Sequence, residues 1–102
     1  MTDQEFKQKV RKSSAWRKFR EHMRDTRRVD EVTLKPLRKN FNLHHMDFDV
    51  SHYDVFDENN FSCLNTNTHD VIHFLYRYYK KDKAILGRIQ FILDRMAELN
   101  NE

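Results

Sequence analysis

Five of the six histidines lie between positions 44 and 73, and four of them form an ordered set. His44 and His45 are adjacent, whereas His69 and His73 are four residues apart. On a helix, residues four apart share one face, so His69 and His73 can bind the same metal ion. In a strand, adjacent side chains point to opposite faces, so His44 and His45 cannot share one role. The spacing predicts a metal site with one histidine of the adjacent pair as its third ligand.

Three imidazole ligands with an open coordination position are typical of a catalytic metal site. The unligated histidine of the adjacent pair is then free to take a proton from water near neutral pH. A divalent ion can stabilise both the developing charge on phosphorus and the leaving 3′ oxygen. This set of residues therefore suits hydrolysis of a phosphodiester bond.

The charged residues are segregated along the chain. Residues 1–40 contain thirteen Lys and Arg against six Asp and Glu, and residues 41–76 contain six acids and no Lys or Arg. A basic arm before an acidic, histidine-rich middle favours binding of an anionic polymer by the arm. We expect Arg17, Arg20 and Arg24 to contact DNA, and a solvated helix face is the alternative. The acidic middle should repel DNA. The bound metal cation must offset part of this repulsion, together with Arg77, Lys80, Lys81 and Lys83.

Hydrophobic spacing predicts the elements that carry these residues. Apolar residues three and four apart predict helices over 3–12 and 15–27, with Ser13 or Ser14 as the cap between them, or one kinked helix over both segments. Residues 31–37 and 41–50 have the character of short strands, and residues 57–60 that of a loop. A helix capped by Thr68 is expected over 69–81, and another over 83–99. The stripe on this last helix is predicted to be core, with a separate coiled-coil seam as the alternative, and it consists of Ile85, Ile89, Ile92, Met96 and Leu99.

The chain of 102 residues has the size of a single domain. We expect an α+β domain with a basic helical arm over 1–28, a core over 29–81 and a C-terminal helix over 82–102 that packs across the core. Cys63 is the only cysteine, which excludes an internal disulfide and a Cys-rich zinc finger. No apolar run is long enough to span a bilayer, and residues 1–12 lack the apolar segment of a signal peptide, so we expect a cytoplasmic protein.

Residues 43–73, LHHMDFDVSHYDVFDENNFSCLNTNTHDVIH, resemble the motif of HNH endonucleases, also called the ββα-metal motif, in its His-His version. The spacing is similar to that of the nuclease colicins, with Asn60 fifteen residues after His45 and His69 nine residues after Asn60. The preceding stretch VTLKPLRKNFNLHH resembles the lead-in of small phage HNH proteins, where a TGKPL turn is common. Leu34 replaces the glycine of that turn.

The resemblance implies that His44, His69 and His73 are metal ligands and that His45 is the general base. It implies further that Asn60 braces the loop and orients that base. Arg38 lies six residues before His44, where colicin-like nucleases have an arginine near the scissile phosphate. Many HNH proteins also contain two Cys-x-x-Cys pairs, which are absent here as in the nuclease colicins, so the C-terminal helix must support the motif.

The expected function is a metal-dependent DNA endonuclease of low sequence specificity, because no long recognition helix is evident. The metal is Zn²⁺, Ni²⁺, Mg²⁺ or Mn²⁺, and the sequence leaves the choice among them open. It also leaves open the oligomeric state and whether the enzyme nicks one strand or cleaves both. The cytoplasm is that of the host if a phage encodes the chain. One alternative is a non-catalytic nucleic-acid-binding module in which the histidines hold a structural zinc. Another is a phage accessory protein that has lost the chemistry.

Overall fold

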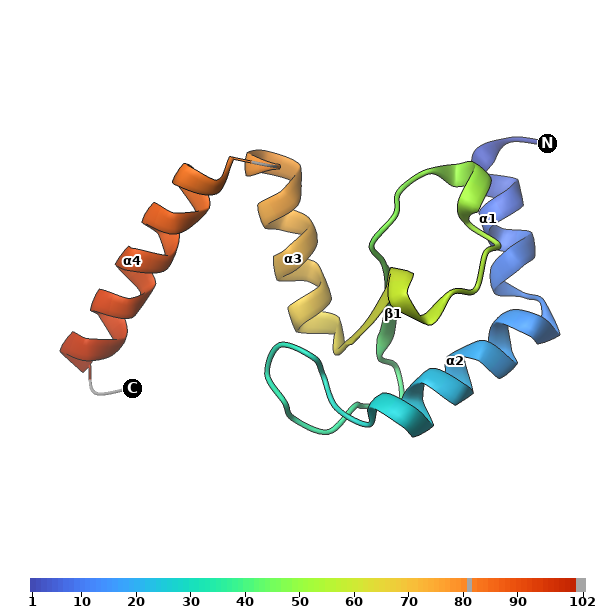
Figure 1. The fold of residues 1–102 in the computed structure, drawn as a ribbon, viewed down its shortest axis with the longest axis horizontal. Helices are drawn as coiled ribbons and strands as arrows, with labels where there is room; N and C mark the ends of the chain where they lie inside the picture. The colour runs from blue at the N-terminus through green and yellow to red at the C-terminus, as the bar shows by residue number, and fades with distance from the viewer. Residues whose placement is uncertain (81, 101–102) are drawn as a thin grey trace. The chain divides into compact units, whose positions relative to one another are not determined.

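The computed structural model describes residues 1–80 and 82–100. It contains a two-stranded antiparallel sheet, so the predicted α+β class is confirmed (Figure 1). The helices are α1 (Asp3–Arg11), α2 (Ser14–Arg27), α3 (Thr66–Tyr79) and α4 (Lys83–Asn100); the strands are β1 (Asn42–His45) and β2 (Phe61–Leu64), and short 3-10 helices are η1 (Val50–His52) and η2 (Glu58–Asn60). Within the described residues, no helix is both long and apolar enough to cross a membrane. The chain divides into two units, Met1–Asp70 and Val71–Glu102.

The two basic helices of the first unit form where the apolar spacing predicts them. Ser13 begins α2, and its hydroxyl accepts a hydrogen bond from the Trp16 amide at 3.1 Å. This bond satisfies one of the free N–H groups at the start of the helix. Trp16 and Met23 on α2 are buried, as is Val10 on α1. The predicted caps and apolar faces of this arm are therefore confirmed, with Ser13 rather than Ser14 as the cap.

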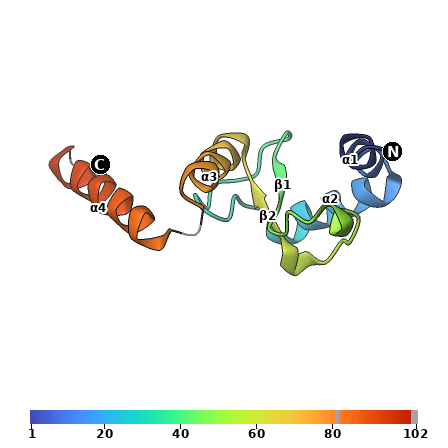
Figure 2. The same ribbon diagram turned by 90° about the horizontal axis from the view of Figure 1, so that it is seen from above.

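The sheet pairs β1 with β2, and the ribbon shows the two strands side by side (Figure 2). Its register places His44 opposite Ser62 and His45 opposite Phe61. The predicted strand over 31–37 is wrong: this segment is a turn and loop with one isolated bridge, Val29 to Pro36. The predicted strand over 41–50 is shorter, ending at His45. The second strand instead lies at Phe61–Leu64, immediately before α3.

The core of the first unit lies between α2 and the sheet. Its buried residues are Trp16, Met23, Phe41, Leu43, Phe61 and Cys63, with Phe19, Leu37 and Phe56 packed against them. Cys63 is completely buried and is part of this core. Burial of this apolar surface is the main force that holds β1 and β2 beside the helical arm.

The second unit contains most of α3 and all of α4. Helix α3 begins at Thr66, so Thr68 lies inside the helix and is not its cap, and the predicted end at residue 81 lies outside the described residues. Helix α4 confirms the predicted helix over 83–99, but it has no buried residue. Ile92, Met96 and Leu99 are each more than half exposed, so this stripe forms no core within the described part of its own unit. Packing of α4 across the strands stays a prediction.

Candidate metal centre

Three histidines converge in the structure. His44 belongs to β1, and His69 and His73 belong to successive turns of α3. One ligand atom from each lies within 4.8 Å of the other two. Although the boundary between the units falls between His69 and His73, both lie on one continuous helix, which fixes their spacing. These three histidines, which we call the three-His cluster, could bind one metal ion.

The surroundings of the three-His cluster are partly apolar. His44 is only 5% exposed. Its ring lies edge-on to that of His69, with centroids 5.4 Å apart, and to that of Phe48, with centroids 5.9 Å apart. Imidazole nitrogens favour Zn²⁺, Ni²⁺ and similar ions, whereas Mg²⁺ prefers oxygen ligands. The donor set therefore fits a transition-metal ion better than a hard cation.

His45 points away from the three-His cluster, as the alternation of side chains along a strand predicts. Its ring stacks on Trp16, with centroids 5.6 Å apart, and on Tyr53, with centroids 4.2 Å apart. Nε2 of His45 is buried and has no hydrogen-bond partner among the described residues. Burial lowers the pKa of His45, opposed by a hydrogen bond with the Tyr53 backbone. Burial among aromatic rings therefore favours the neutral form of the imidazole.

Asn60 ends η2 and directly precedes β2. Its backbone carbonyl accepts a hydrogen bond from the Met46 amide at 2.9 Å, and its own amide donates to the Asp57 carbonyl at 2.9 Å. The first bond joins the loop that follows β1 to the start of β2. Asn60 thus links this loop to β2 through its backbone, and its predicted roles in bracing the loop and orienting His45 stay predictions.

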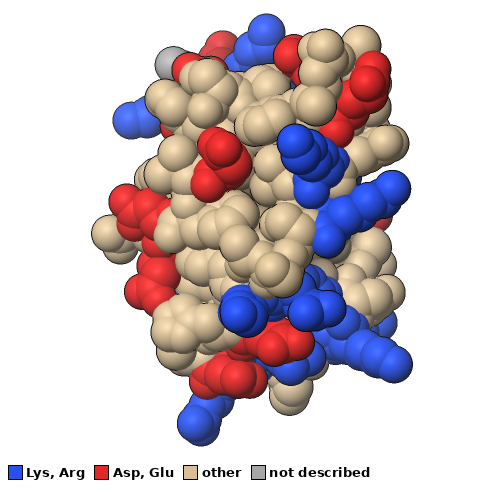
Figure 3. Space-filling view, turned by 90° about the vertical axis from the view of Figure 1, so that its right-hand side faces the viewer, with Lys and Arg blue, Asp and Glu red and all other residues tan. Residues whose placement is uncertain are grey.

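The four arginines expected at DNA differ in their surroundings. Arg17 and Arg38 are exposed, and Arg24 lies 3.8 Å from the Asp25 carboxylate. Arg20 instead donates to the backbone carbonyls of Lys39 and Phe41, at 3.2 and 2.7 Å, and its guanidinium lies 4.0 Å from the centroid of the Phe41 ring. These contacts give Arg20 a structural role just before β1. Basic and acidic side chains are interspersed on the face shown in Figure 3.

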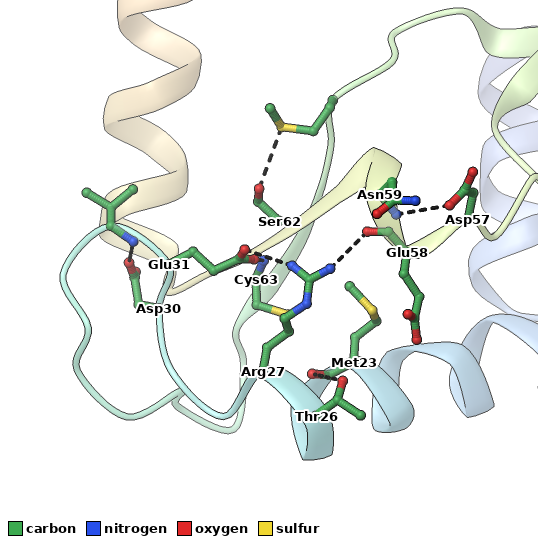
Figure 4. Close-up of polar contacts among 12 residues, drawn as sticks. Met23, Thr26, Arg27, Asp30, Glu31, Asp57, Glu58, Asn59, Ser62 and Cys63 are labelled. Carbon is green, nitrogen blue, oxygen red and sulfur yellow. Dashed lines mark hydrogen bonds and ion pairs between the residues drawn. The ribbon is translucent and has the colours of Figure 1, made fainter.

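A polar network that the sequence did not reveal holds β2 to α2 (Figure 4). Arg27 donates to the Glu31 carboxylate at 2.7 Å and to the Glu58 carbonyl at 3.0 Å. The Glu31 carboxylate in turn accepts from the Cys63 amide. The four-residue separation of Arg27 and Glu31 is compatible with an ion pair, but their joint contact with β2 depends on tertiary structure.

Asp47, three residues after His44, contacts the imidazole of His52. The Asp47 carboxylate lies 2.8 Å from Nδ1 of His52 and accepts from the Asp49 amide at 2.9 Å. Its hydrogen bond with His52 raises the pKa of that histidine. These groups are on the exposed loop after β1, so Asp47 supports the loop.

Comparisons of the chain with protein-family models, curated proteins and solved structures gave no match. The support for the candidate site therefore comes from the residues and their geometry. The best-defined feature of the site is the three-His cluster.

Proposed function

We propose that this protein is a metal-dependent endonuclease that hydrolyses phosphodiester bonds in DNA. The observation that supports this function is the convergence of His44, His69 and His73 from a strand and the following helix. The resemblance to HNH endonucleases assigns ligand roles to the same three positions. A site with three protein ligands leaves coordination positions for substrate and water.

In the proposed mechanism, the side chains on the two faces of β1 have different roles. His44, His69 and His73 hold the metal, which when bound stabilises negative charge on the phosphate and the leaving oxygen. His45 takes a proton from the attacking water through Nε2, and Asn60 keeps the loop beside it in place. Arg17, Arg24 and Arg38 contact the DNA backbone, which gives affinity with little sequence preference.

The mechanism places two demands on His45. Its Nε2 is buried, so binding of DNA must open a path for water to this atom. Its ring also points away from the three-His cluster, so binding must bring the ring and the phosphate together. Catalytic hydrogen bonds often form only in the complex with substrate, so the free geometry is compatible with a base in this position. The neutral imidazole favoured by burial is the form that can accept a proton.

Cleavage of supercoiled plasmid tests this function. Wild-type protein is incubated with Mg²⁺, Mn²⁺, Ni²⁺ or Zn²⁺, with and without chelator, beside His69→Ala and His45→Ala. We expect metal-dependent nicking or linearisation, with a loss of about 100-fold or more in each variant. His22→Ala is the matched control, because His22 is exposed and lies outside the three-His cluster. Full activity in chelator, or in a folded His69→Ala protein, would contradict the proposal.

Burial of His45 Nε2 favours one other function, a nucleic-acid-binding module with a structural metal. In such a protein His45 serves only the packing of Trp16 and Tyr53. Wild-type protein would then retard DNA on a gel without cleaving it in any metal, and a folded His45→Ala variant would retard it equally. Cleavage lost in His45→Ala decides for the enzyme.

A further inference from the structure

The first turn of α3 is fastened to residues 30–40 by a group of hydrogen bonds, which we call the α3 clamp. The Asn65 amide donates to the Asp30 carboxylate at 2.8 Å. The Asn65 side chain accepts from the Arg38 amide at 2.8 Å and donates to the Pro36 carbonyl at 3.1 Å. The Thr66 hydroxyl adds a bond to the Asn40 carbonyl at 3.3 Å. The start of α3 is thus held by bonds from several directions.

Asp30 is the buried centre of the α3 clamp. Its side chain is completely buried and also accepts hydrogen bonds from the Val32 and Thr33 amides, at 2.8 and 2.9 Å. Burial acts to raise the pKa of Asp30, but these bonds and those from Asn65 and the Thr68 hydroxyl lower it to about 2. The carboxylate is therefore ionised near neutral pH, and its charge complements the positive end of the helix dipole.

The α3 clamp lies next to a ligand of the three-His cluster. Thr68 directly precedes His69, and the His69 amide donates to the Asn65 carbonyl at 3.0 Å. His44 lies on β1, which pairs with β2, and β2 leads directly into Asn65. The direction in which α3 leaves the sheet therefore decides whether His69 faces His44, and Asp30 holds that direction.

We propose that Asp30 is a positioning residue for the metal centre: it holds the first turn of α3 so that His69 faces His44, and thereby sets the affinity for the metal. Asp30 does not touch the three-His cluster in this role and acts through the backbone of Asn65 and the hydroxyl of Thr68. The inference depends on the metal-binding part of the proposed function and is independent of DNA cleavage.

The test measures binding of Co²⁺ alone to full-length protein. Asp30→Asn keeps the shape of the side chain but replaces one acceptor oxygen with an NH₂ group facing backbone amides. We expect a rise of about tenfold or more in the Kd for Co²⁺ and an altered visible ligand-field band at saturation, because supporting residues of metal sites have effects of this size. Asp25→Asn is the matched control, since the Asp25 side chain is 75% exposed, and it should bind like wild type.

Fluorescence of Trp16, the only tryptophan, establishes whether Asp30→Asn is folded under the conditions used. If it unfolds, Thr68→Val replaces it, because this change removes only the hydroxyl bond to Asp30 and should weaken Co²⁺ binding about threefold. A folded variant with wild-type affinity and an unchanged band would overturn the proposal, as would wild-type protein that binds no Co²⁺. Wild-type protein that binds Co²⁺ in an Asp30-dependent way but never cleaves DNA would support the proposal and refute the endonuclease alone.

Discussion

Helices α2 and α4 have similar apolar stripes but opposite burial. Met23 of α2 is completely buried, and Trp16 is 9% exposed. On α4, Ile92 and Met96 are 59% and 53% exposed, although their spacing is equally helical. Periodicity thus predicts which face of a helix is apolar, but it carries no information about what covers that face. In the first unit the apolar face of α2 packs against the sheet, whose two strands lie further along the chain.

The largest effect expected from this difference concerns the two methionines. Met23→Ala should destabilise the first unit by about 2–5 kcal/mol, because it removes buried methylene groups and leaves a cavity. Met96→Ala is the same chemical change at an exposed position and should alter stability by about 0.5 kcal/mol or less. Urea unfolding followed by circular dichroism and Trp16 fluorescence measures both. Similar losses in the two variants would show that the α4 stripe is covered in solution.

A second contrast lies between the aspartates at the starts of α3 and α4. Asp30 at α3 is buried, whereas Asp82 caps α4 from an exposed position through the Ile85 amide at 3.1 Å. The pKa of Asp30 is lowered from 3.8 to about 2. Its ionised form therefore adds stability that is fully present above pH 3.8 and is lost as the pH falls through 2. This contribution is about 2 kcal/mol.

Urea unfolding of wild type and Asp30→Asn at several pH values isolates this contribution from the titration of other carboxylates. We expect the free energy of unfolding of wild type to exceed that of Asp30→Asn, and most of this difference of about 2 kcal/mol to be lost between pH 5 and pH 2. Asp82→Asn is the control, since asparagine caps a helix as well as aspartate does, and it should change stability by less than about 0.5 kcal/mol. An advantage of wild type that is independent of pH would contradict an ionised Asp30 in the native state.

The ligand set of the candidate site was easier to predict than the strands. His69 and His73 require only helical spacing, and the opposite directions of His44 and His45 require only strand alternation, so both follow from local geometry. The sheet did not. The sequence of residues 31–37 predicts an extended strand. Instead, the Asp30 carboxylate accepts hydrogen bonds from the amides of Val32 and Thr33, and the segment forms a turn. The strand at Phe61–Leu64 is too short to show a clear alternation, and its amide at Cys63 depends on distant Glu31.

The turn within residues 30–35 offers the last and smallest test. Leu34 has a φ of 62°, in the left-handed region that favours glycine, and its side chain is 72% exposed. This is the position where the phage HNH turn has glycine. Leu34→Gly should therefore stabilise the first unit by about 1 kcal/mol, because it relieves backbone strain and removes little packing. Thermal unfolding followed by Trp16 fluorescence should show a higher Tm.

Val32→Gly is the matched control for this change. Val32 is exposed in the same turn, but it is absent from the residues with positive φ in the described part of the chain, so glycine there only adds freedom to the unfolded state. We expect it to lower stability by about 0.5–1 kcal/mol. Opposite signs at two neighbouring exposed positions would show that backbone conformation, and not loss of apolar surface, decides the outcome. A lower Tm for Leu34→Gly would instead mean that the Leu34 side chain contributes contacts that outweigh the strain at this turn.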